Sequence, residues 1–126
     1  MVNTFIAKFI LAEAPPKPDY AATSINVFPN APPRPTTNIQ SQDGADLLEL
    51  GFKDGLGTGS HTLNSNNTQG QYGEIANPKN LSDISGHVDI NALDGTYKGD
   101  FSAKWTDVQG RIWKVVSAFD ITVVPQ

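Results

Sequence analysis

A chain of 126 residues is the size of one domain, and its formal net charge of −4, with nine scattered Lys and Arg, offers no basic surface for nucleic acid or for an anionic membrane face. The absence of cysteine excludes disulfides and cysteine-held zinc, and the absence of any long apolar stretch predicts no insertion in a membrane. Charged residues are only 17% of the chain, and the abundance of Asn, Ser, Thr, Gly and Gln suits a β protein with many turns.

The first predicted element is a strand over residues 3–12. Its apolar residues recur at a period of two, which places them on one face. They are Phe5, Ala7, Phe9 and Leu11. Ala12-Glu13-Ala14 resembles a signal-peptide cleavage site, but the apolar stretch before it is short and Lys8 interrupts it. We therefore expect a strand here, and no signal peptide.

A proline-rich segment follows over residues 14–35 and holds seven of the nine prolines. Proline donates no backbone hydrogen bond, so this composition predicts a stiff surface loop. A short strand over residues 21–28 is expected within it, with Ile25 and Val27 on one face. The alternative is that the segment is a polyproline ligand for an aromatic groove of another protein.

The middle of the chain contains three more predicted strands, over residues 46–53, 60–64 and 70–76. The first of them alternates cleanly between apolar and polar residues. The glycine-rich run over residues 55–59 predicts a tight chain reversal after the strand over residues 46–53, because glycine accepts a positive φ.

The last third of the sequence has the clearest pattern. Three strands are predicted here, over residues 85–92, 96–106 and 111–124. Asp94-Gly95 and Gln109-Gly110 fall between these alternating runs and predict the two hairpin turns. Ser117 interrupts the apolar face of the final strand, and we expect a bulge or a bend there.

Together these runs predict about eight short strands and no helix over residues 1–126. Such a pattern is typical of a single all-β domain, either an antiparallel β-barrel or a strongly curved β-sandwich, here with a C-terminal up-and-down meander. We expect one of these two forms, because closure removes the exposed edges of a sheet.

Motifs that would indicate catalysis are weak. The glycines of residues 55–59 lack the G-K-[ST] sequence of a phosphate loop, and no helix is predicted after them. His61 and His87 are the only histidines, and their Ser and Asp neighbours in sequence define no triad geometry. We therefore predict that the chain is not an enzyme and holds no cofactor.

A metal site is not predicted either. The run Asp89–Gly95 resembles the start of a calcium loop, but Leu93 stands where an oxygen ligand is needed and the glycine is one place late. A looser calcium site in a loop, at Asp43 and Asp46, is the alternative.

The aromatic side chains are the most informative remaining feature. Most are expected in the core, among them Tyr97, Phe101, Trp105, Trp113 and Phe119. Alternatively, some line a barrel mouth or stack on a sugar, because Trp and Tyr combine a large apolar face with a polar edge. Tyr72, beside Gly70 and Gly73, is expected to be the most exposed aromatic. The candidate ligand-binding residues are Tyr72, Trp105 and Trp113.

Several short motifs, most of them with a glycine, run through the chain from Gly59 onward. They are Gly59-Ser60-His61-Thr62-Leu63-Asn64, Ser85-Gly86-His87-Val88-Asp89-Ile90, Asp94-Gly95, Gly99-Asp100-Phe101-Ser102-Ala103 and Ala118-Phe119-Asp120-Ile121. On these motifs, residues 57–124 resemble a group of small uncharacterised bacterial β-barrel domains that are lipocalin-like. The resemblance implies a barrel and an exported or cell-surface bacterial protein, and it carries over no catalytic residue.

These expectations favour a non-catalytic binding module for a small apolar ligand or a glycan. The alternative is a structural or assembly protein, or a protein-interaction subunit, in which the proline-rich segment packs on a partner. The expected partner is therefore a small ligand, a glycan or another protein.

Overall fold

The computed structural model describes residues 3–11, 17–28, 36–91 and 93–123, which form two antiparallel β-sheets. The first sheet has the strand order β2 (Tyr20–Ala21), β1 (Thr4–Ile10), β11 (Ile112–Thr122), β10 (Thr96–Thr106), β9 (Ser82–Asn91) and β6 (Gly59–Asn64). The second has the order β3 (Ser24–Phe28), β4 (Thr36–Asp43), β5 (Asp46–Leu56), β7 (Thr68–Glu74) and β8 (Lys79–Asn80). Within the part of the chain that is described, no helix is long and apolar enough to span a membrane.

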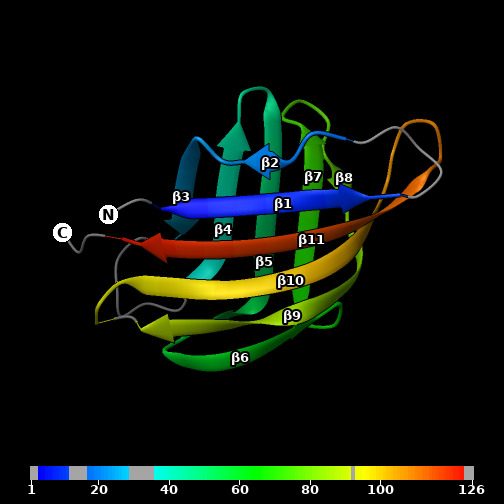
Figure 1. Cartoon of the computed structure of the whole chain (residues 1–126). Helices are drawn as coiled ribbons and strands as arrows, with labels where there is room; N and C mark the ends of the chain where they lie inside the picture. The colour runs from blue at the N-terminus through cyan, green and yellow to red at the C-terminus, as the bar shows by residue number, and fades with distance from the viewer. Residues whose placement is uncertain (1–2, 12–16, 29–35, 92, 124–126) are drawn as a thin grey trace.

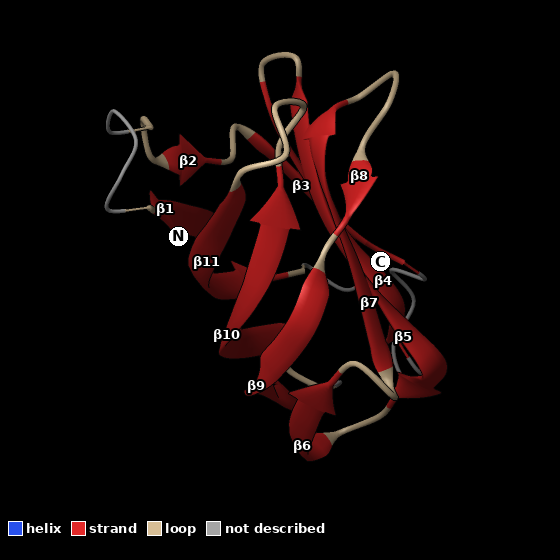
Figure 2. Cartoon of the chain, turned by 90° about the vertical axis from the view of Figure 1, so that its right-hand side faces the viewer, coloured by secondary structure: helices blue, strands red, loops and turns tan. Residues whose placement is uncertain are grey.

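The two sheets lie face to face as two layers (Figure 2). The strands of the first sheet run across those of the second rather than along them (Figure 1). Among the described residues no strand pair links the sheets, so they are not closed into a barrel. The all-β fold is confirmed, and its sheets are antiparallel throughout, but the expected closure is not observed.

The core lies between the sheets and follows from the period-two pattern. In β1 and β11, buried and exposed side chains alternate without interruption over nearly the whole strand. Fully buried side chains come from both sheets and include Phe5, Ile39, Leu48, Leu50, Val88, Val115 and Phe119. Phe101 and Trp113 are buried as expected, whereas Trp105 is only partly buried.

The C-terminal meander is confirmed, because β9, β10 and β11 pair in succession. Glycine has a positive φ in both hairpin turns, 69° at Gly95 and 80° at Gly110. No bulge is present at Ser117: its pairing with β1 and β10 is regular, and its buried hydroxyl donates a hydrogen bond to Ile6 O at 2.6 Å. The register shift lies between Ser102 and Lys104, where β10 pairs with β9.

Three of the eleven described strands were not expected, namely β2, β4 and β8. Two of them have only two residues. The described part of the proline-rich segment is tied into both sheets, because β2 pairs with β1 and β3 pairs with β4. Residues 14–16 and 29–35 of that segment, like residue 12 of the first predicted strand, lie outside the described residues.

Candidate functional site

Three aromatic rings from both sheets meet where β1 and β10 end, beside the β10–β11 hairpin at the right of Figure 1. Phe9 comes from β1, Trp105 from β10 and Tyr72 from β7. The ring centroids are 4.6 Å apart for Phe9 and Tyr72, 5.0 Å for Tyr72 and Trp105, and 6.0 Å for Phe9 and Trp105. These separations are typical of favourable aromatic pairs. We call Phe9, Tyr72 and Trp105 the aromatic cage.

The ammonium group of Lys17 lies over the aromatic cage. Its Nζ is 5.1 Å from the centroid of Phe9 and 5.5 Å from the centroids of both Tyr72 and Trp105. The residue is half-buried, and within the described residues its ammonium has no ion pair. Cation–π attraction to the three rings is therefore its main contact.

A pocket of about 290 Å³ opens beside the cage and includes Tyr72 and Trp105 in its wall. Its charged and amide groups come from Lys17, Asp46, Glu74, Asn77, Lys79 and Asp107. The volume is at the lower end of the roughly 300–1,000 Å³ that ligand pockets usually have. Such a pocket suits a ligand of one or two rings that offers an apolar face and polar edges.

Trp113 lines a second open pocket, of about 360 Å³, that adjoins the first. Lys17, Trp105 and Asp107 line both pockets. The guanidinium carbon of Arg111 lies 5.7 Å from the centroid of the Trp113 ring and covers it from the solvent side of the hairpin. Trp105 and Trp113 thus lie on one surface with two adjoining pockets. Lys17 and Asp107 lie where these two pockets meet.

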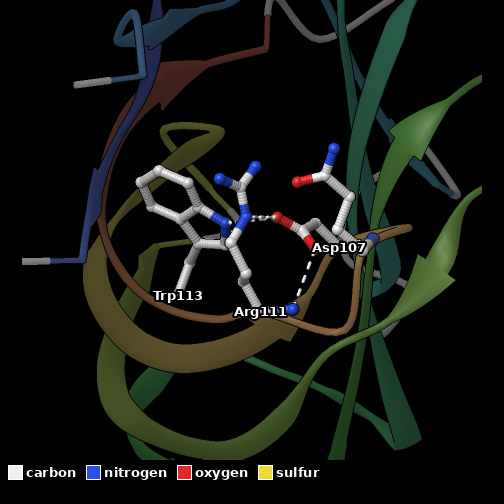
Figure 3. A network of polar contacts seen from close by, with 4 residues as sticks. Asp107, Arg111 and Trp113 are labelled. Atoms are coloured by element: carbon white, nitrogen blue, oxygen red, sulfur yellow. Dashed lines mark hydrogen bonds and ion pairs between the residues drawn. The ribbon is translucent and has the colours of Figure 1, made fainter. Parts of the chain in front are cut away.

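Asp107 organises the β10–β11 hairpin beside this surface (Figure 3). One carboxylate oxygen, Oδ1, accepts hydrogen bonds from the backbone N–H groups of Gln109 and Arg111, both at 2.9 Å. The other, Oδ2, accepts from Arg111 Nε at 2.8 Å and from Trp113 Nε1 at 2.9 Å. A single buried carboxylate therefore fixes the turn, the guanidinium and the indole together.

These contacts also hold the pKa of Asp107 well below its ordinary value of 3.8. The largest cause is the hydrogen bond from the Trp113 indole, followed among the lowering effects by those from the Arg111 side chain and the two backbone N–H groups; burial opposes them. The carboxylate is thus charged over the whole physiological range of pH.

Replacing Asp107 with Asn is expected to lower the melting temperature by about 5–10 °C. All four partners of the carboxylate are donors, so an amide NH₂ in place of either oxygen faces donors and leaves them unpaired. Thermal unfolding followed by near-UV circular dichroism measures the change. Asp54→Asn, at an exposed aspartate with the same change of charge, is the matched control and should leave the melting temperature almost unchanged.

The same variant should show a defined dependence on pH. The folded state binds the Asp107 proton more weakly than the unfolded chain, so this stabilisation is fully present above pH 3.8 and is lost as the pH falls below that value. The difference in melting temperature between the wild type and Asp107→Asn should therefore shrink below about pH 4. A difference that stays constant down to about pH 2 would contradict the role given to the carboxylate.

Tyr72 and its neighbour Tyr20 are both neutral phenols. Burial is the largest cause that raises the pKa of Tyr20 to about 12, and it raises the pKa of Tyr72 well above its ordinary value of 10. The hydroxyl groups of Tyr20 and Ser41 are 2.9 Å apart, and Ser41 in turn donates to Leu48 O at 2.7 Å. These hydrogen bonds connect β2, the edge strand of the first sheet, with β4 and β5 of the second.

One polar atom in the cage lacks a partner. The indole Nε1 of Trp105 is buried and makes no hydrogen bond with the described residues, whereas Nε1 of Trp113 donates to Asp107. An unpaired buried donor costs about 1–3 kcal/mol, and folded proteins keep few of them. The position of Trp105 is therefore set by the other two rings rather than by its own hydrogen bonding.

The structure brings two of the three predicted site residues, Tyr72 and Trp105, into contact and places Trp113 in the adjoining hollow. The expectation that Tyr72 is the most exposed aromatic is wrong, because only 3% of its surface is accessible. Phe9 was expected only as a core residue, and nothing in the proline-rich segment singled out Lys17. No local pattern could have revealed them, since the contacts of both are made with residues distant in sequence.

The histidines lie apart from this surface and from one another. His87 pairs with Thr62 and His61 with Val88 on adjacent strands, so the two imidazoles point to opposite faces of the first sheet. Nε2 of His61 is 2.7 Å from Gly57 O, and Nδ1 of the exposed His87 is 3.3 Å from Asp100 Oδ1. Among the described residues, no three His, Asp or Glu side chains gather as a metal site would require, at Asp43 and Asp46 or elsewhere.

The fold and the site define an antiparallel two-sheet β protein with an aromatic pocket at one end. Comparison with known proteins found no matching family, curated protein or solved structure.

Proposed function

We propose that the chain is a non-catalytic binding module that holds a glycan in the pocket beside Tyr72 and Trp105. The observation that carries this proposal is the pocket in which the partly exposed ring of Trp105, beside the buried ring of Tyr72, lies among carboxylate, amide and ammonium groups. A sugar ring has apolar C–H faces that stack on aromatic rings and hydroxyl groups that bond to such polar neighbours. The pocket offers both kinds of contact within the space of one or two sugar rings.

The filling of the core favours this surface pocket over an apolar ligand held between the sheets. The ring of Phe5 lies 5.3 Å from that of Phe119 and 6.4 Å from that of Phe101. All three side chains are buried in the middle of the fold. Native side chains thus occupy the space that an interior ligand would need.

A glycan array tests the proposal. Trp105→Ala is expected to weaken binding of any glycan that the wild type retains by at least about tenfold, because aromatic anchors dominate binding sites. Asn77→Ala, at an exposed rim amide, should weaken it less and leave folding intact. Phe28→Ala, at an aromatic side chain that is 46% exposed on β3, is the control and should bind normally. An array on which the folded wild type binds no glycan would contradict the proposal.

The second candidate is a structural or assembly role. The outer face of β1 and β11 exposes Ile6, Ile10, Ile112 and Val116, which are 41–56% accessible. Apolar groups gathered on one face are typical of protein contacts. A light-scattering mass that stays monomeric at high protein concentration would disfavour this role.

The resemblance of residues 57–124 to lipocalin-like domains supports a ligand-holding role and an exported bacterial setting. In the proposal, the two facing sheets serve as an open counterpart of such a barrel, with the pocket at one end.

A further inference from the structure

We infer that the aromatic cage is a binding site for an organic ammonium group, and that Lys17 fills this site from within the chain until such a ligand displaces it. The inference rests on the proposed function, because it names the chemical group that the ligand presents to the pocket. It concerns Phe9, Tyr72, Trp105 and Lys17.

The geometry of the cage supports this assignment. A cation is attracted to an aromatic face when it lies within about 6 Å of the ring centroid. The ammonium of Lys17 satisfies this condition for three rings at once, at 5.1, 5.5 and 5.5 Å. Because the rings come from β1, β7 and β10, the site is built by both sheets and does not depend on one local turn.

The contacts of the Lys17 ammonium group support the inference further. Asp46, Glu74 and Asp107 line the same pocket, and yet no described carboxylate forms an ion pair with the Lys17 ammonium. A primary ammonium is strongly hydrated and gives up water reluctantly. The aromatic cage offers three ring faces to a cation and no ion pair. It is therefore better suited to a more weakly hydrated, alkylated cation than to a primary ammonium group.

The charge of the pocket favours an incoming cation once Lys17 has moved aside. Asp107 is already paired with Arg111. The two ammonium groups of Lys17 and Lys79 therefore face two carboxylates of the lining that have no ion pair among the described residues, those of Asp46 and Glu74. Without Lys17, one ammonium faces two carboxylates. A cationic ligand restores the lost positive charge, whereas a neutral ligand does not.

Two kinds of molecule carry such a group. One is a methylated amine, such as a choline head group, and the other is a sugar whose amino group is protonated. Both offer a cation that aromatic rings attract, and only the second also presents a sugar ring to the rest of the pocket. The experiment separates the two sources.

Isothermal titration calorimetry of Lys17→Ala against tetramethylammonium, choline and a glucosamine trimer tests the inference. Removing the internal competitor is expected to tighten binding of at least one of these probes by about tenfold. Lys53→Ala, at an exposed lysine outside the pocket, makes the same change in net charge and should bind like the wild type. Lys17→Gln, which keeps most of the side chain, covers the case in which Lys17→Ala unfolds.

The side chain of Lys17 gives a direct second readout. Its Nζ lies 5.1–5.5 Å from three ring centroids, so the NMR signals of the protons on the neighbouring Cε should be shifted upfield in the wild type. Saturation with the tightest probe should return them to ordinary lysine values. Signals that already have ordinary values in the free protein would overturn the inference.

The outcomes are distinct. Tighter binding of choline and tetramethylammonium supports a methylated amine as the source, and tighter binding of the glucosamine trimer alone supports an amino sugar. If Lys17→Ala binds all three probes no better than Lys53→Ala, the inference is overturned. If an N-acetylated or neutral glycan binds and leaves the Lys17 signals unchanged, the inference fails while the proposed function stands.

Discussion

Replacing Phe5 with Ala is expected to lower the free energy of unfolding by about 3–5 kcal/mol. The Phe5 side chain has no accessible surface and packs against the rings of Phe101 and Phe119. Its strand, β1, is held on both sides, by β2 and by β11, so the surrounding backbone cannot move in to fill the space. The cavity therefore persists, and its cost adds to the lost burial of the ring.

Urea denaturation measured by tryptophan fluorescence checks this value. The expected loss is a substantial part of the roughly 5–15 kcal/mol that stabilises an ordinary domain, so the variant should unfold at a clearly lower urea concentration than the wild type. Ile6→Ala is the matched control, because Ile6 is the next residue on the same strand and is 45% exposed. Equal losses at Phe5 and Ile6 would contradict the assigned core.

Much of the fold could be predicted because its long strands alternate strictly. In β1, β10 and β11, a period of two is enough to separate inward from outward side chains. The strand β4 was missed because Ile39 is its only large apolar residue, and its other described inward position, Ser41, is polar. Ser41 is nevertheless buried, since the Tyr20 hydroxyl and Leu48 O satisfy its hydroxyl.

Alternation also leaves the partners of each strand undetermined. β6 follows β5 in sequence but pairs with β9 in the other sheet, while β5 pairs with β4 and β7. Inward and outward faces are the same in a barrel and in two stacked sheets, so the pattern could not distinguish them. The pairing depends on contacts between strands that are distant in the chain.

The candidate site could be predicted only in part. Tyr72 and Trp105 were predicted from their residue type. The glycines near Tyr72, however, led to the wrong prediction that its side chain is exposed. The side chain of Leu81 packs on Gly70, with Cδ1 2.8 Å from where a Cβ would stand, so the space beside this glycine is filled rather than open. Lys17 reaches the cage from a segment with no periodic pattern, so no sequence feature distinguished it.

Replacing Gly86 with Ala is expected to cost about 3 kcal/mol or more, because the added methyl group would meet backbone rather than a flexible side chain. A Cβ at Gly86 would stand 2.1 Å from Asp100 O and 2.6 Å from Phe101 Cα, both on the adjacent strand β10. Relief of these contacts requires β9 and β10 to move apart within the first sheet, and β9 also pairs there with β6.

Gly57→Ala separates this steric effect from the general effect of losing a glycine. A Cβ at Gly57 meets nothing within 4 Å, so the substitution should leave stability within about 0.5 kcal/mol of the wild type. Urea denaturation gives both free energies, and backbone amide spectra should show the changes at Gly86→Ala centred on β9 and β10. A Gly86→Ala variant as stable as Gly57→Ala would mean that these strands lie farther apart than described. The close approach of β9 to β10 at Phe101 would then not be part of what stabilises the first sheet.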